Sequence, residues 1–281
     1  MREIEAALIT DTVQEMCVRA NRVLGGDMKA AFAQSMEREE SAAGLIVLEQ
    51  LAENARLAGE RESPLCQDTG FAVFFLDVGQ DLHVAGGSLE GAVQEGVRRG
   101  YRDGLLRASI VERPFSGRLN TGDNTPAVIH TRIVPGEDLR IIFDAKGAGS
   151  ENQSRLRMLK PSDGREGVRD FIVEAAVSAG PSACPPLIVG AGVGGTFEMS
   201  ALIAKRALLR ELGAPHPDPE TTALEAECLE AINDSGVGPM GFGGRVTALA
   251  VHIETHPCHI ASLPVAVNIE CHSHRHREVT L

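Results

Sequence analysis

The sequence lacks tryptophan, contains a single tyrosine and has only six cysteines among its 281 residues. So few aromatic side chains argue against a surface that stacks the bases of single-stranded nucleic acid. Cysteines this sparse argue against a small scaffold held together by disulfides. No two cysteines are separated by only two residues, which disfavours a zinc ribbon and an ordinary ferredoxin site.

Positive charge and long hydrophobic runs are also scarce. There are 27 Lys and Arg against 39 Asp and Glu, for a net charge of −12. This balance argues against nucleic-acid binding and favours a soluble protein. The opening MREIEAALITD does not have the pattern of a secretory signal, and no apolar run reaches the length of a membrane span. We therefore expect a cytoplasmic protein that binds neither nucleic acid nor membrane.

Hydrophobic residues make up 43% of the chain, enough to bury a sizeable core. The apolar periodicity predicts helices within residues 3–60 and at 88–101, 165–179, 197–212 and 220–234. It predicts strands at 71–78, 127–134, 139–143, 246–254 and 263–270, the second and third paired through a turn at Pro135-Gly136. We expect a single mixed α/β domain over residues 1–281, with an N-terminal helical segment and glycine-rich active-site loops.

Residues 183–196, ACPPLIVGAGVGGT, contain the G-x-G-x-x-G spacing of a dinucleotide-binding turn. The motif comes late in the chain, however, and no strand ending in an acidic residue follows at the expected distance of about 20 residues. The alternative is a tight connection from strand to helix in which glycines allow close packing. The same stretch contains Cys184, so the chemistry of this region could also lie with the thiol.

The six cysteines fall into different sequence contexts. Cys17 and Cys228 lie within helical patterns, which favours buried structural thiols. Cys66, Cys184 and Cys271 each lie where a loop meets a regular element, and backbone N–H groups at such places can stabilise thiolates and bridging sulfides. By spacing alone, three scattered cysteines are more often structural than metal ligands, so both interpretations stay open.

Two further polar patterns have alternative interpretations. His272, His274 and His276 alternate near the C-terminus and would share one face of an extended segment. They could form a zinc site or a solvated strand end, and we favour the solvated end for His274 and His276. Asp68, two residues after Cys66, could be a turn residue or an acid–base group.

Taken together, several loops resemble those of the class I iron–sulfur fumarate hydratases. The similarity is greatest to the α subunit of the two-subunit form, a relative of the L-tartrate dehydratase α subunit, and it spans nearly the whole chain. The loops that carry it, in order, are PLCQDTG, NTGDNTP, AKGAGSENQSRL, ACPPLIVGAGVGGT, GPMGFGG and HIASLPVAVNIECHSHRH.

The resemblance implies a [4Fe–4S] cluster held by Cys66, Cys184 and Cys271, with one iron left open for substrate. It implies that the glycines after Cys184 shape the backbone near the cluster and do not bind a dinucleotide. On this interpretation the cysteine, and not the glycine turn, carries the chemistry.

The resemblance also implies roles for residues that handle the substrate. Gln67 and Asp68 would lie in the active site, with Asp68 taking part in proton transfer. Arg107 would bind a carboxylate of a dicarboxylate substrate, as guanidinium groups do well. The backbone at Gly149 would contact the substrate, and His259 matches the active-site histidine of the family.

The implied activity is the reversible hydration of fumarate to L-malate, a step of the tricarboxylic acid cycle. L-tartrate dehydratase or a related 2-hydroxy-diacid dehydratase is the alternative within the family. Single-chain members carry a second domain that supplies further arginines, a lysine and a catalytic hydroxyl, so we expect this chain to need a separate β subunit, in a hetero-oligomer with two α chains. Outside the family, a zinc or iron–sulfur binding protein on this scaffold and a nucleotide-dependent oxidoreductase are the competing hypotheses.

Overall fold

The computed structural model describes residues 2–281, which form two compact units. Unit one contains residues 2–24, 55–148 and 275–281, and unit two contains residues 25–54 and 149–274. Each unit combines helices with a four-stranded sheet, so the predicted mixed α/β class is confirmed. Within residues 2–281, no helix has both the length and the apolar character needed to cross a membrane.

Unit one has a four-stranded sheet, a two-stranded sheet and two long helices. Its larger sheet has the order β10-β5-β2-β4, formed by β10 (His276–Thr280), β5 (Leu139–Lys146), β2 (Phe71–Gly79) and β4 (Val128–Val134). The smaller sheet pairs β1 (Arg2–Glu5) in parallel with β3 (Leu82–Ala85). The helices are α1 (Ala6–Arg22) and α4 (Leu89–Asp103).

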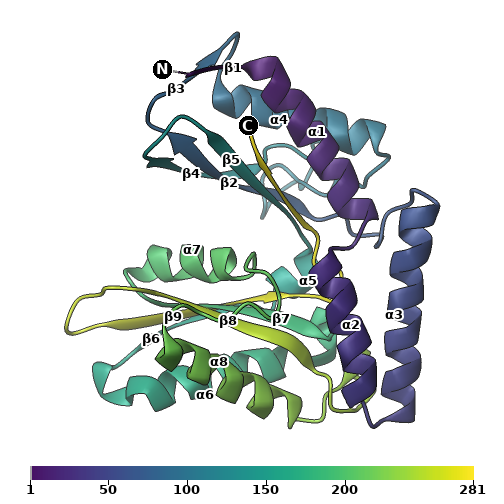
Figure 1. The fold of residues 1–281 in the computed structure, drawn as a ribbon, viewed down its shortest axis with the longest axis vertical. Coiled ribbons are helices and arrows are strands. Elements are labelled where there is room, and N and C mark those ends of the chain that lie inside the picture. Colours follow the sequence, from purple (N-terminus) through teal and green to yellow (C-terminus); the bar gives the residue numbers. More distant parts are fainter. Residues whose placement is uncertain (1) are drawn as a thin grey trace. The chain divides into compact units, whose positions relative to one another are not determined.

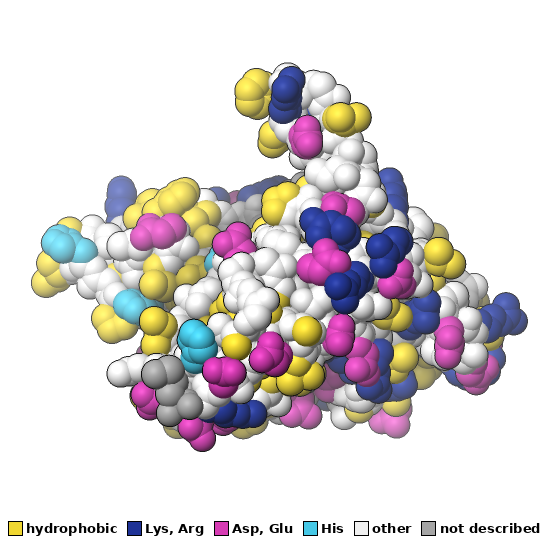
Figure 2. Space-filling view, turned by 90° about the horizontal axis from the view of Figure 1, so that it is seen from above, with side chains coloured by type: hydrophobic (Ala, Val, Ile, Leu, Met, Phe, Trp, Pro, Cys, Tyr) yellow, Lys and Arg dark blue, Asp and Glu magenta, His cyan; other side chains and the backbone are white. Residues whose placement is uncertain are grey.

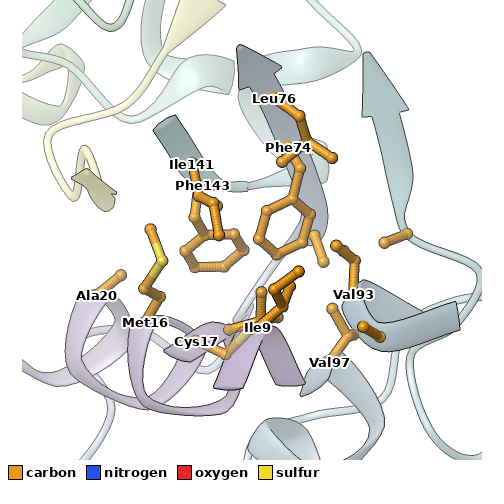
Figure 3. Close-up of a cluster of buried hydrophobic side chains, with 14 of the residues drawn as sticks. Ile9, Met16, Cys17, Ala20, Phe74, Leu76, Val93, Val97, Ile141 and Phe143 are labelled. Carbon is orange, nitrogen blue, oxygen red and sulfur yellow. The ribbon is translucent and has the colours of Figure 1, made fainter. Parts of the chain in front are cut away.

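The core of unit one forms where α1 and α4 pack against the larger sheet (Figure 3). Positions four residues apart, such as Ile9 and Val13 in α1, lie on one helix face and are fully buried. They meet inward-facing aromatic residues of the sheet, including Phe74 and Phe143, whose ring centroids are 5.0 Å apart. Ser88 is the N-cap of α4, because its hydroxyl accepts a hydrogen bond from the Gly91 N–H at 3.1 Å.

Unit two is a four-stranded sheet with helices on both faces. The strand order is β6-β9-β7-β8, formed by β6 (Arg155–Leu159), β9 (Leu263–Glu270), β7 (Leu187–Gly194) and β8 (Ala248–His256). Figure 1 shows α7 on one face of this sheet and α6 and α8 on the other. The helices of this part of the chain are α2 (Gly26–Arg38), α6 (Gly164–Ala179), α7 (Phe197–Ala207) and α8 (Pro219–Asn233), while α3 (Ala42–Glu60) and α5 (Ala148–Glu151) include residues of both units.

The predicted pairing of the strands around Pro135-Gly136 is wrong. β4 and β5 both exist, but β2 lies between them, parallel to β4 and antiparallel to β5. β2 is apolar along almost its whole length and is buried, so an interior position in the sheet suits it better than an edge. The helix expected at residues 197–212 also ends earlier, at Ala207, and β1, β3, β6 and β10 were not predicted.

The glycines of residues 190–194 lie inside β7 and not in a turn. An added Cβ at Gly190 would lie 2.3 Å from the carbonyl oxygen of Ala204, and one at Gly192 would lie 2.1 Å from that of Ser200. Both oxygens belong to α7, so only glycine lets this helix lie against the strand. The close packing that was expected of these glycines is therefore confirmed, but Gly190 and Gly192 lie in the strand and not in the connection to the helix.

The charged surface carries ion pairs between opposite charges. Arg157 pairs with Glu174 at 2.9 Å and Arg165 pairs with Glu227 at 2.8 Å, all four with partly exposed side chains. Figure 2 shows acidic and basic side chains interspersed on the face that it presents. Pairs this exposed each contribute little to stability, about 0–1 kcal/mol, so both units depend mainly on their apolar cores.

Candidate active site

The residues predicted to form the site divide between the two units. Unit one contains Cys66, Gln67, Asp68 and Arg107, and unit two contains Gly149, Cys184, His259 and Cys271. Within each unit, the structure brings some of these residues together through side-chain and backbone hydrogen bonds.

In unit one, the half-buried carboxylate of Asp68 is held by two backbone N–H groups. Its Oδ1 accepts a hydrogen bond from Gly70 at 3.0 Å, and its Oδ2 accepts one from Ala148 at 3.0 Å. The first bond is the turn contact that an Asp makes two residues ahead of itself. The second links Asp68 to the residue directly before Gly149. Each oxygen retains a further acceptor site, so the turn role and a role in proton transfer are compatible.

Cys66 and Gln67 precede Asp68 in the same loop, between α3 and β2. The Cys66 thiol is half-buried and donates to Oε1 of Gln67 at 3.5 Å, while the Gln67 side chain is exposed. Both side chains can therefore reach a ligand at the surface of unit one.

Arg107 lies beyond the end of α4, and its backbone is fixed to the loop that contains Asp68. The Thr69 hydroxyl donates to the carbonyl oxygen of Arg107 at 3.0 Å. The Arg107 side chain is exposed, and none of the carboxylates of residues 2–281 forms an ion pair with its guanidinium. This guanidinium is therefore available for a carboxylate ligand.

In unit two, the loops of Cys184 and Cys271 lie side by side. Cys184 follows a short 3-10 helix and has a left-handed backbone (φ 54°), and Cys271 is the first residue after β9. The carbonyl oxygen of Cys184 receives the backbone N–H of His272 at 3.3 Å and lies 3.0 Å from the His272 Nδ1. These contacts fix the neighbour of Cys271 to Cys184.

The environments of the cysteines separate two groups. Cys17 and Cys228 are fully buried in helices, and burial raises the pKa of both thiols, that of Cys228 to about 12. A thiol that stays protonated is a poor metal ligand. Cys66, Cys184 and Cys271 are instead half-buried and located in loops, where a thiolate can reach an iron–sulfur cluster.

The segment formed by α5, which contains the exposed Gly149, and the residues up to Ser154 is stabilised by a polar network that the sequence did not reveal. Lys205 in α7 lies 2.7 and 2.8 Å from the two carboxylate oxygens of Glu151. The side-chain amide of Asn268 donates to Glu151 and to Ser154, both at 2.9 Å. This network connects the segment to α7 and β9.

His259 lies in the exposed connection between β8 and β9. Its Nδ1 accepts the backbone N–H of Ala261 at 3.1 Å, and the residue borders a surface cavity of about 440 Å³ that is also lined by Met158 and Phe197. The hydrogen bonds of His259 in the described chain are local, so within unit two the structure does not join it to the cysteine loops.

The expectation of a solvated end at His274 is wrong. Its side chain is only 1% exposed. After Cys271 the chain turns, with the His274 N–H bonded to the carbonyl of Cys271 at 3.2 Å, and residues 273–275 are buried. His276 is half-buried and opens β10, which pairs with β5.

The sequence analysis also missed the residues that hold the site loops in place. Most of them lie in the loops that carry the resemblance, but no sequence pattern indicated a supporting role for any of them. The residues are Thr69, Tyr101 and Asn124 in unit one and Glu151, Lys205, Asn268 and His272 in unit two.

Comparison with known proteins identifies the family of the chain. The model of the fumarate hydratase (Fumerase) family matches residues 10–280. A putative L(+)-tartrate dehydratase subunit alpha of Methanocaldococcus jannaschii is 40% identical over 272 residues, which cover 95% of each chain. The L(+)-tartrate dehydratase subunit alpha of Escherichia coli (strain K12) is 31% identical over 271 residues, covering 95% of this chain and 88% of the relative. The chain therefore belongs to the fumarate hydratase (Fumerase) family and is a hydro-lyase.

Proposed function

We propose that this chain is the α subunit of a cytoplasmic hydro-lyase that reversibly hydrates fumarate to L-malate together with a separate β subunit. The family match supports the reaction type, and the names of the relatives support the role as an α subunit. One observation carries the choice of a dicarboxylate substrate: Thr69 links the unpaired Arg107 to the loop of the Asp68 carboxylate at 3.0 Å. The proposed carboxylate-binding group, Arg107, and the proposed proton-transfer group, Asp68, therefore lie in two loops of unit one that are joined by a hydrogen bond.

Cys66, Cys184 and Cys271 would hold a [4Fe–4S] cluster, in an oligomer that contains two α chains. When bound, the cluster supplies a Lewis acid at the iron that lacks a protein ligand, which withdraws electron density from an oxygen of the substrate. The half-buried loop positions of these cysteines support this assignment. The buried Cys17 and Cys228 would take no part.

The chain's own residues bind the diacid and move a proton. Arg107 binds one carboxylate through two parallel N–H bonds, while Gln67 and the backbone at Gly149 orient the substrate. In the direction from malate to fumarate, one carboxylate oxygen of Asp68 accepts the proton from the carbon whose neighbour loses its hydroxyl group. In the hydration direction the same oxygen returns that proton. His259 would donate or accept hydrogen bonds at the substrate's oxygens.

A second candidate is dehydration of L(+)-tartrate, which the names of the relatives favour. Tartrate carries a hydroxyl on both central carbons, so loss of one as water leaves an enol that rearranges to a keto diacid. The same carboxylate clamp and proton-transfer group would serve this reaction.

The test is turnover by the chain assembled with its β partner and prepared without oxygen. Fumarate hydration and L(+)-tartrate dehydration are measured in parallel. A kcat/KM at least tenfold higher for fumarate supports the proposal, and the reverse preference replaces it with the tartrate reaction. Turnover of neither diacid would contradict a dicarboxylate hydro-lyase.

Asp68→Asn is the matched active-site variant, and Asp81→Asn, at an exposed position, is its control. We expect the first to lose most of its turnover and the second to retain it. Both oxygens of Asp68 accept backbone N–H groups, and the amide NH2 of Asn cannot accept, so Asp68→Asn should also be less stable by about 1–3 kcal/mol.

A further inference from the structure

We propose that Asn124 and Thr69 are positioning residues that set the place of Arg107 relative to Asp68, an inference that rests on the proposed function of these two groups. Asn124 and Thr69 lie in different loops of unit one, and their side chains are 0% and 1% exposed. They are too deeply buried to contact substrate themselves, so they would act through their hydrogen bonds.

Asn124 joins two loops through the two ends of its amide. Its Nδ2 donates to the carbonyl oxygen of Gly70 at 3.1 Å, and its Oδ1 accepts the backbone N–H of Ser109 at 2.8 Å. Gly70 is the residue whose own N–H holds the Asp68 carboxylate, and Ser109 follows Arg107 by two positions. A single buried amide therefore connects the backbone of the Asp68 loop to the backbone of the Arg107 segment.

Thr69 makes a second connection between the same loops. Its hydroxyl donates to the carbonyl oxygen of Arg107 at 3.0 Å. The Tyr101 hydroxyl lies 2.8 Å from the carbonyl oxygen of Thr69 and 3.1 Å from that of Gly70. Tyr101 of α4 therefore holds the loop of Asp68 in place. Thr69 and Asn124 in turn connect the Arg107 segment to that loop.

The need for such anchoring follows from the chemistry. Arginine has a long, flexible side chain, so its guanidinium can be directed accurately only if the backbone that carries it is fixed. In a hydration, the carbon that receives the proton lies at a set distance from the carboxylate that Arg107 clamps. A displacement of about 1 Å between the clamp and the proton-transfer group can lower the rate about 100-fold.

The backbone conformation of Asn124 allows a substitution that removes the side chain without disturbing the main chain. Its φ is 61°, in the left-handed region, which glycine, asparagine and aspartate adopt most readily. Asn124→Gly therefore keeps this backbone conformation and removes both hydrogen bonds. Asn124→Asp keeps the shape but replaces the donor to Gly70 with an acceptor. Thr69→Val removes the hydroxyl while keeping the shape of the side chain, and Thr69→Ser restores the donor.

The first experiment measures kcat and KM of the assembled enzyme. We expect Asn124→Gly, Asn124→Asp and Thr69→Val to lower kcat/KM about 10- to 100-fold, with Thr69→Ser close to wild type. Thr131→Val, which removes an exposed hydroxyl in β4, is the control and should leave the kinetics unchanged. Wild-type kinetics in Asn124→Gly and Thr69→Val would overturn the proposal.

A double-mutant cycle separates positioning from a general loss of structure. If Asn124 acts through Arg107, Asn124→Gly should have little further effect on kcat/KM in an Arg107→Ala background. If the two losses multiply instead, Asn124 has only an independent structural role and the proposal fails.

A third measurement does not depend on turnover, so it distinguishes failure of this inference from failure of the proposed function. Amide hydrogen exchange of the Arg107–Ser109 segment should be at least tenfold faster in Asn124→Gly than in wild type, because the Ser109 N–H loses its acceptor. Unchanged exchange there would refute the positioning role. An enzyme that turns over no diacid but shows this faster exchange would refute only the proposed substrate class.

Discussion

The backbone N–H and the imidazole Nδ1 of His272 both lie within hydrogen-bond distance of one atom, the carbonyl oxygen of Cys184, at 3.3 and 3.0 Å. Cys184 has a left-handed backbone that favours glycine and asparagine over cysteine. The double contact from His272 helps to hold this residue in a conformation that it would not adopt alone. Two segments far apart in the sequence are thereby fixed together beside the two cysteines of unit two.

We predict that His272→Ala weakens retention of the proposed cluster without unfolding the chain. The ring contact is lost, the backbone contact remains, and the Cys184 loop gains freedom. Iron and sulfide content, followed over time after exposure to air, should fall several-fold faster than in wild type. His83→Ala, at an exposed position in β3, should match wild type. Equal rates of loss in both variants would show that His272 has no bearing on the cluster.

A second prediction concerns the glycines of β7. An alanine at position 192 would place its Cβ 2.1 Å from the backbone oxygen of Ser200 in α7. Because a backbone atom cannot give way as a flexible side chain can, we expect Gly192→Ala to lower the free energy of unfolding by about 3 kcal/mol or more. Urea denaturation of the full chain measures this.

Gly26→Ala is the matched control for Gly192→Ala. Gly26 begins α2, and an added Cβ there meets no atom within 4 Å. The free energy of unfolding should stay within about 0.5 kcal/mol of wild type or rise slightly. Similar losses in the two variants would contradict the account of β7 and α7.

The sequence pattern predicted most helices and strands but not which strands lie next to one another in the sheets. The buried run FAVFFLDV identified β2 as a strand, yet its position between β4 and β5 depends on contacts among distant segments that no local pattern records. β6 (RLRML) and β10 (HREVT) were missed because each has only five residues and no run of β-branched or aromatic side chains. The candidate site residues were predicted from the resemblance of the loops to those of a known family. The residues that support them, such as Asn124 and His272, do so through tertiary hydrogen bonds, which no sequence pattern predicts.

A third prediction follows from the buried His252, whose side chain is 3% exposed. Burial, reinforced by the positive charge of Arg210, lowers the pKa of His252 to about 4, against the opposing effects of its bond to the Ala207 carbonyl and of Asp27. Below the unfolded pKa of about 6.5, the unfolded chain binds a proton that the folded chain does not. Stability should therefore fall as the pH drops from about 6.5 to about 4.

The contribution of His252 to this slope is about 1.4 kcal/mol per pH unit. His252→Asn retains an N–H donor for the Ala207 carbonyl and removes the titration, so its free energy of unfolding should vary less between pH 5 and pH 7. Urea denaturation of both proteins at these two pH values makes the comparison. The same pH dependence in both would show that His252 does not titrate in this range on unfolding.

The central claim is that Cys66, Cys184 and Cys271 hold an iron–sulfur cluster, and the most direct measurement is the iron and acid-labile sulfide content of cysteine variants. The chain is prepared with its β partner in the absence of oxygen. Wild type, Cys17→Ser and Cys228→Ser should each contain about four iron and four sulfide per α chain. Cys66→Ser, Cys184→Ser and Cys271→Ser should each lose most of both. Zinc in place of iron, or iron that is lost with Cys228→Ser and kept when all three proposed ligands are replaced, would contradict the account.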